Sequence, residues 1–151
     1  MKPFVLNLVL AWLWILLGFL SGLVLGLFFH RDNWLGGYSS FKRRLYRLGH
    51  ISLFALGVVN LLFYLTVDRS FGATSMLQIA SWSFIIGAVS MPICCLIMAH
   101  RPKARLLFAL PVLSLLAAGG ATLAGILILE MPARQSPESS ALITSFPSPS
   151  P

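Results

Sequence analysis

Three histidines are the side chains of this sequence best suited to holding a cofactor. They are His30, His50 and His100, and each lies at or near the end of a long apolar run. Imidazoles at matched depth on neighbouring helices are what a bis-histidine haem or a metal ion requires. We select His50 and His100 as the pair, with His30 as the substitute, because His50 lies inside the apolar boundary. The alternative interpretation is that all three simply sit at a membrane–water interface.

An amide and a proline are the other unusual residues inside the apolar runs. Asn60 falls near the middle of the second run, and a buried amide in lipid needs partners on neighbouring helices. We therefore expect Asn60 to join helices. Shallower partners are offered by polar residues of the third run, Gln78, Ser81 and Ser83. Pro92 has no N–H, so it leaves the Ala88 carbonyl without its helical donor and should kink its helix.

Small residues recur every four positions on the first and last apolar runs. The strip on the first run consists of Gly18, Gly22 and Gly26, and the strip on the last of Ala117, Ala121 and Gly125. Such small-xxx-small spacing allows two helix backbones to approach closely. We interpret both strips as packing faces within one chain, for example of the first helix against the fourth. Association between two copies is the alternative.

The elements that carry these residues are four apolar runs, 4–29, 45–67, 76–99 and 106–129. Each reaches the roughly 20 residues that a helix needs to cross a bilayer core. No water is available there to bond the backbone, so the runs must be helical. Short connections make neighbouring helices antiparallel. The sequence predicts an all-α integral membrane protein, an antiparallel bundle of four transmembrane helices.

The chain divides into a membrane domain and a tail. Residues 1–130 form the four-helix domain, and its two halves look alike: each contains a helix ending in His-Arg, a basic loop and a returning helix. Two tandem hairpins would explain this likeness, and so would two helices that end at the same interface. Residues 131–151 are rich in serine and proline, a composition that predicts disorder.

Positive charge is concentrated in the first and third connections. Eight lysines and arginines lie there, namely Arg31, Lys42, Arg43, Arg44, Arg47, Arg101, Lys103 and Arg105. Lys2, Arg69 and Arg134 lie on the other side and complete the total of eleven. Because cytoplasmic loops are enriched in lysine and arginine, we expect loops 30–44 and 100–105 in the cytoplasm and both termini outside. The plasma (inner) membrane is the expected location.

The basic cluster of the first connection also predicts a lipid preference. Lys42, Arg43, Arg44 and Arg47 can attract anionic headgroups at roughly 1 kcal/mol per charge. Topology and lipid together account for the net charge of +7. We expect no nucleic-acid partner, since no RNA-binding signature is found in the sequence.

The missing motifs argue against catalysis and transport. The sequence has no HExxH, GxSxG, P-loop or Cys-x-x-Cys motif. It has no charged residue deep in any apolar run, as a proton relay or ion path usually requires. We expect a non-enzymatic subunit, assembly factor or scaffold that binds other membrane proteins or itself. The alternatives are a haem- or metal-binding redox protein that uses the cytoplasmic histidines, and an oligomeric channel or transporter.

Overall fold

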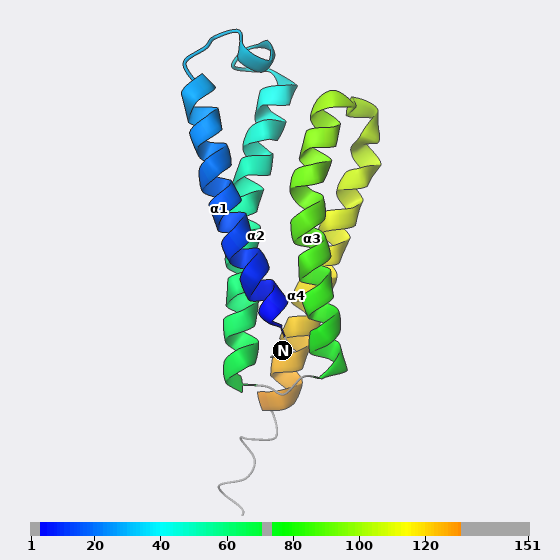
Figure 1. The fold of residues 1–151 in the computed structure, drawn as a ribbon. Coiled ribbons are helices and arrows are strands. Elements are labelled where there is room, and N and C mark those ends of the chain that lie inside the picture. Colours follow the sequence, from blue (N-terminus) through cyan, green and yellow to red (C-terminus); the bar gives the residue numbers. More distant parts are fainter. Residues whose placement is uncertain (1–3, 71–73, 131–151) are drawn as a thin grey trace, which may run out of the picture.

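The computed structural model describes residues 4–70 and 74–130, which are helical and contain no strand. The long helices are α1 (Val5–Phe28), α2 (Phe41–Ser70), α3 (Ser75–His100) and α4 (Ala109–Glu130). Two 3-10 segments, η1 (Trp34–Gly36) and η2 (Pro102–Phe108), precede α2 and α4 (Figure 1). The tail 131–151 and its predicted disorder lie outside the described residues, as does Lys2.

Four helices of this structure are long and apolar enough to cross a membrane. They agree with the four predicted runs, except that α2 begins at Phe41 and so includes the basic cluster. A cap explains the earlier start. The Ser40 hydroxyl accepts the Arg43 N–H at 3.2 Å and donates to the Leu35 carbonyl at 2.6 Å. Such a cap satisfies a backbone donor that the first turn of a helix leaves free.

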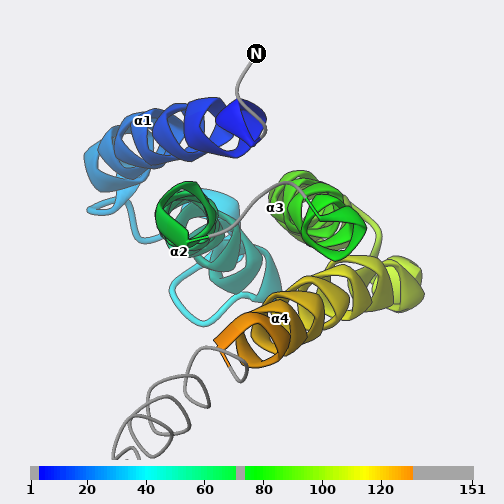
Figure 2. The same ribbon diagram turned by 90° about the horizontal axis from the view of Figure 1, so that it is seen from below.

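Each helix packs against the next one in the chain. The broad contacts join α1 to α2, α2 to α3 and α3 to α4, and α1 touches α3 at few places. Viewed from below, α1 and α4 lie on opposite sides of the α2–α3 pair (Figure 2). The two small-residue strips therefore face different neighbours, and the suggested pairing of the first helix with the fourth is not among the broad contacts.

The hydrophobic core lies at the end of the molecule where α2 leads toward α3. Its buried members come from three helices: Phe63, Val67, Leu77, Ala80, Phe84 and Ala118. Ala80 and Ala118 are fully buried, so small side chains allow α3 and α4 to approach each other there. Toward η1 and η2 the two halves of the molecule diverge (Figure 1). Tight packing at one end and divergence at the other leave room for a cavity near the loops.

Two of the three glycines in the α1 strip are points of close approach to α2. A Cβ on Gly18 would lie 2.8 Å from Cε2 of Phe54, and one on Gly22 would lie 2.9 Å from Cε1 of His50. Gly26 has no atom within 4 Å of that position among the described residues. On α2, Gly57 contributes from the other side, because its Cβ would lie 3.1 Å from the Ala11 carbonyl oxygen.

The α4 strip divides in a similar way. Gly125 is buried, and a Cβ on it would lie 3.4 Å from Cδ2 of Leu77 in α3, while Ala121 packs against the core. Ala117 is exposed, and the fully buried residue of this turn is its neighbour Ala118. The buried face of α4 is thus rotated by one residue from the predicted strip at this turn.

Bulky replacements on the α1 strip should have unequal effects. We expect Gly18→Leu and Gly22→Leu each to destabilise the fold by about 1–3 kcal/mol, since the added atoms collide with Phe54 or His50. Gly26→Leu is the matched control and should change little. Unfolding by sodium dodecyl sulfate in mixed micelles measures the differences. Equal stability of all three variants would contradict this packing.

Candidate functional site

A buried hydrogen-bonded group ties three helices together near the core. Asn7 Nδ2 of α1 donates to Asn60 Oδ1 of α2 at 2.9 Å and, at 3.4 Å, to the Ser81 carbonyl oxygen of α3. The Ser81 hydroxyl donates to Asn7 Oδ1, and Asn60 Nδ2 donates to the Leu56 carbonyl at 2.8 Å. Asn7 and Asn60 are fully buried, and both amides are paired. This arrangement fastens three helices, and each polar side-chain atom of the two amides has at least one partner.

Sequence reasoning identified Asn60 and Ser81 but missed Asn7. Asn7 lies in the first turn of α1, where a polar residue resembles an ordinary helix end. However, α1 begins partway along α2: Phe4 packs edge-to-face on Phe63 at 5.7 Å, and α2 continues beyond it to Ser70. The first turn of α1 is therefore level with Asn60. The only signal in the sequence was a second asparagine in an apolar run.

The carbonyl freed by Pro92 has a donor from another helix. Pro92 lies inside α3, and the Trp14 indole Nε1–H of α1 donates to the Ala88 carbonyl oxygen at 2.9 Å. The sequence predicted the free carbonyl but not its partner. Because an unpaired carbonyl in an apolar interior is costly, this bond fixes α1 against α3 at a second point.

His50 is held between α1 and α2 by a serine. Its Nδ1 lies 2.9 Å from the Ser21 hydroxyl oxygen, and that hydroxyl donates its one hydrogen to the Gly18 carbonyl at 3.0 Å. The single hydroxyl hydrogen can serve only one of these two contacts, so the tautomer of His50 decides whether Nδ1 donates to Ser21 or accepts from it. Fixing one ring nitrogen in this way orients an imidazole as a ligating histidine requires.

The other two histidines have different surroundings. His100 is exposed at the end of α3, and its Nε2 lies 3.1 Å from the Tyr46 hydroxyl of α2. His30 is exposed just beyond α1. Within ranges 4–70 and 74–130, no group of three His, Cys, Asp or Glu side chains could hold a metal ion. Haem or metal binding by His50 with His100 or His30 stays a prediction.

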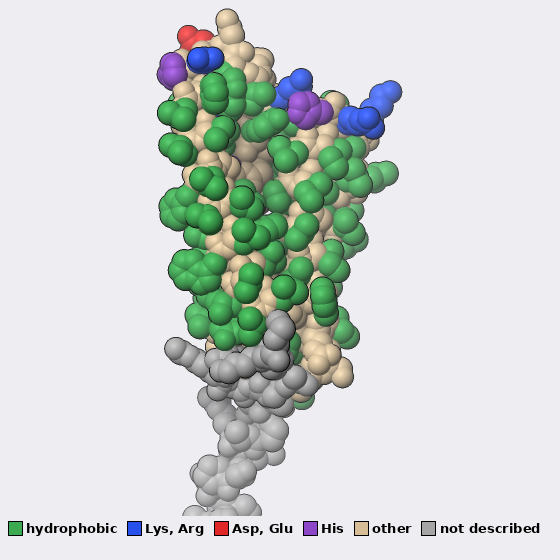
Figure 3. All heavy atoms as spheres, in the orientation of Figure 1, with side chains coloured by type: hydrophobic (Ala, Val, Ile, Leu, Met, Phe, Trp, Pro, Cys, Tyr) green, Lys and Arg blue, Asp and Glu red, His purple; other side chains and the backbone are tan. Residues whose placement is uncertain are grey.

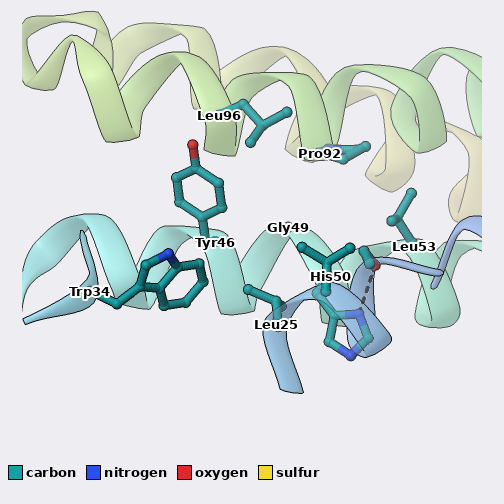
Figure 4. A pocket seen from close by; sticks show the side chains of 10 residues that line it. Leu25, Trp34, Tyr46, Gly49, His50, Leu53, Pro92 and Leu96 are labelled. Atoms are coloured by element: carbon teal, nitrogen blue, oxygen red, sulfur yellow. Dashed lines mark hydrogen bonds between the residues drawn. The ribbon is translucent and has the colours of Figure 1, made fainter. Parts of the chain in front are cut away.

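A cavity of about 310 Å³ lies beside His50. Its walls come from α1, η1, α2 and α3, and Figure 4 shows Tyr46 pointing across it from α2 toward Leu96 of α3. The lining residues are Ser21, Val24, Leu25, Trp34, Tyr46, Gly49, His50, Leu53, Pro92 and Leu96. A second hollow, formed by Leu96, Ile97, His100 and Arg101, shares Leu96 with it. An apolar cavity thus lies next to a hollow whose far end carries His100 and Arg101, and Leu96 belongs to both.

The connection before α2 folds around an arginine. Arg43 is only 1% exposed, and its guanidinium carbon lies 4.2 Å from the Tyr38 ring centroid, 5.0 Å from that of Phe29 and 5.8 Å from that of Trp34. Its Nη2 donates to the Phe29 carbonyl at 2.7 Å. Arg47 shares the Phe29 and Tyr38 rings at 5.2 and 5.1 Å. Stacking on aromatic faces stabilises such desolvated cations.

Only two of the four cations that we expected at lipid headgroups are exposed. Lys42 and Arg44 are exposed, whereas Arg43 points inward and Arg47 is half-buried. The chain reverses at Leu35, Gly36 and Gly37, all of which have positive φ. That turn brings Trp34 onto Phe28, stacked at 5.7 Å. Sequence reasoning missed this cage, although the proximity of Trp34 and Tyr38 to an arginine pair was a usable signal.

No family model, curated protein or solved structure matches this chain. The fold and the site alone therefore define its class. It is an all-helical protein with four helices long and apolar enough to cross a membrane, joined by buried side-chain hydrogen bonds.

A double-mutant cycle tests the Asn7–Asn60 bond. Asn7→Leu and Asn60→Leu should each cost about 1–3 kcal/mol, because each leaves a buried amide group unpaired. The double variant should cost less than the sum, with a coupling of about 0.6–1.7 kcal/mol. The free energy of unfolding in mixed micelles is the measurement. Thr66→Val, which removes a bond within one helix, is the control, and strict additivity would refute the coupling.

A second cycle tests the bond from Trp14 to Ala88. Trp14→Phe should cost about 1–3 kcal/mol in the natural sequence, since it leaves the carbonyl without a donor. In a Pro92→Ala background the new backbone N–H can bond Ala88, so the same change should cost clearly less. Trp12→Phe is the control, because Trp12 is 62% exposed. An equal cost of Trp14→Phe in both backgrounds would contradict the assignment.

Proposed function

We propose that this chain is an integral membrane protein whose four helices cross the bilayer in alternating directions as an antiparallel bundle. Large apolar side chains are exposed along all four helices, and a bilayer would cover them. Lysine, arginine and histidine gather at the η1 and η2 end (Figure 3). Positive residues favour the cytoplasmic side, so both loops lie in the cytoplasm and both termini outside. The plasma (inner) membrane is the proposed location.

Within that membrane we propose a non-catalytic role, as a subunit, assembly factor or scaffold of a membrane complex. The observation that carries this proposal is the open small-residue surface of α4. A Cβ on Gly119 or Gly120 would meet no described atom within 4 Å, and Ala117 beside them is exposed. In lipid, helices associate by close packing of such small residues.

The interior supports the same role. The Asn7, Asn60 and Ser81 side chains bond one another, and Trp14 bonds the backbone of α3. Buried polar groups that are already paired stabilise a fold and offer little to a substrate. Lys42 and Arg44, exposed at the start of α2, would hold the loop end at anionic headgroups.

A steric block on α4 tests the proposed association. We expect Gly120→Phe to abolish crosslinking to a partner membrane protein, or to a second copy, because it fills a surface that a partner helix must approach closely. The stability of the isolated chain should not change, since no described atom lies near that position. Crosslinking in native membranes followed by mass spectrometry identifies the partner.

Gly26→Phe is the matched control. Gly26 also has open space above it, but on α1 at the other side of the molecule. The control should retain the crosslinked species. The proposal fails if both variants keep the partner, or if the natural chain forms no crosslinked species.

A further inference from the structure

The cavity beside His50 has no role in the proposed association of α4. It lies between the two diverging halves of the molecule, and its walls come from α1, α2, α3 and Trp34 of η1 (Figure 4). Gly49 and Pro92 belong to its wall, and a Cβ on Gly49 would approach Cβ of Cys95 to 3.5 Å. The α2–α3 contact at Gly49 thus borders the cavity.

Several polar groups of the wall have partners, whereas the Trp34 indole N–H and Nε2 of His50 have none among the described residues. Ser21 and His50 bond each other, and the Ser21 hydroxyl also bonds the Gly18 carbonyl. The Tyr46 hydroxyl bonds His100. A ligand inside the cavity is therefore left mainly with apolar surface, supplied by Val24, Leu25, Leu53, Pro92 and Leu96. A hydrocarbon chain fits such a lining, because it needs no hydrogen bond.

The adjoining surface has the opposite character. His100 lies four residues beyond Leu96 on α3, so about 6 Å farther along the helix axis, and Arg101 follows it directly after the helix ends. No acidic residue lines either hollow in the described part of the chain. The pair of hollows therefore combines an apolar chamber with a cationic rim roughly one helical turn away. This is the layout of a phospholipid, whose anionic phosphate is followed by an acyl chain.

We propose that the cavity holds one acyl chain of an anionic phospholipid, with the lipid phosphate at Arg101 and His100. The inference goes beyond the association role and rests on the proposed membrane insertion. The bound lipid fills the space between the two halves of the molecule at the loop end. In the proposed orientation the site opens to the cytoplasmic leaflet, where anionic lipid is the local ligand.

Native mass spectrometry of the full chain, released from nanodiscs of phosphatidylglycerol and phosphatidylcholine, tests the chamber. The natural chain should retain one phosphatidylglycerol. Leu25→Trp should lose it, because the larger ring occupies the cavity. Leu27→Trp is the matched control, since Leu27 is 61% exposed and does not line the cavity, and it should retain the lipid. Equal retention by both variants, or no retained lipid in the natural chain, would overturn the proposal.

The rim is tested separately, by a substitution that leaves the chamber intact. Arg101→Gln should weaken phosphatidylglycerol binding about fivefold, the equivalent of roughly 1 kcal/mol for one cation, and leave phosphatidylcholine unchanged. Arg105→Gln, exposed and outside both hollows, is the control. Equal retention of both lipids by the natural chain would overturn the cationic rim. Full competition by inorganic phosphate would overturn the acyl chain and indicate a free-anion site.

Failure of this inference can be told apart from failure of the proposed function. Retention of lipid by Leu25→Trp, with crosslinking through α4 intact, would overturn the lipid site and leave the proposed association untouched. A chain that fractionates away from membranes would instead remove the basis of both.

Discussion

Side-chain hydrogen bonds decide how α1 lies against the rest of this molecule. In lipid, an apolar side chain gains little free energy by exchanging a lipid tail for another helix. Hydrophobic burial therefore does not select one particular helix as the neighbour of α1. Asn7 reaches both Asn60 and Ser81, and Trp14 reaches the Ala88 carbonyl. α1 has little other contact with α3. These bonds, together with the glycine contacts to α2, set its position across the α2–α3 pair.

That position explains the architecture of the loop end. α1 is fastened to α3 in its first half, through Asn7 and Trp14, and beyond those points it follows α2 through Gly18 and Gly22. Near the loops the described residues show no hydrogen bond between α1 and α3, and only the Tyr46–His100 hydrogen bond joins α2 to α3 where the two halves diverge (Figure 1). The cavity, His50 and the basic rim all lie in that divergence. A uniform apolar stripe on α1 would lack these localised bonds, and nothing comparable would then hold one end of α1 closer to α3 than the other.

In the connection before α2, side-chain contacts likewise decide which charged groups are exposed. Arg43 follows a turn that requires positive φ at Leu35, Gly36 and Gly37, and that turn arranges aromatic rings around its guanidinium. The outward charge of the cluster is correspondingly smaller than the sequence implies. Lys42 and Arg44 remain exposed, while Arg43 points inward among the aromatic rings of the loop.

The sequence by itself determined the number and type of the long helices, because a long apolar run can satisfy its backbone groups internally only as a helix. It did not determine where α2 begins, since the Ser40 cap extends that helix back to Phe41. It also indicated that Asn60 needs a partner and that Pro92 frees a carbonyl, since both follow from the chemistry of one residue. Only the tertiary structure decided which groups pair with the Asn60 amide and with the carbonyl that Pro92 frees. The contacts of Asn7, Trp14 and Arg43 depend on the relative height and rotation of the helices. Apolar helix surfaces alone would allow several other heights and rotations. The small-residue strips show this limit clearly: spacing marked Gly18 and Gly22, but only packing distinguished them from Gly26 and selected Ala118 over Ala117.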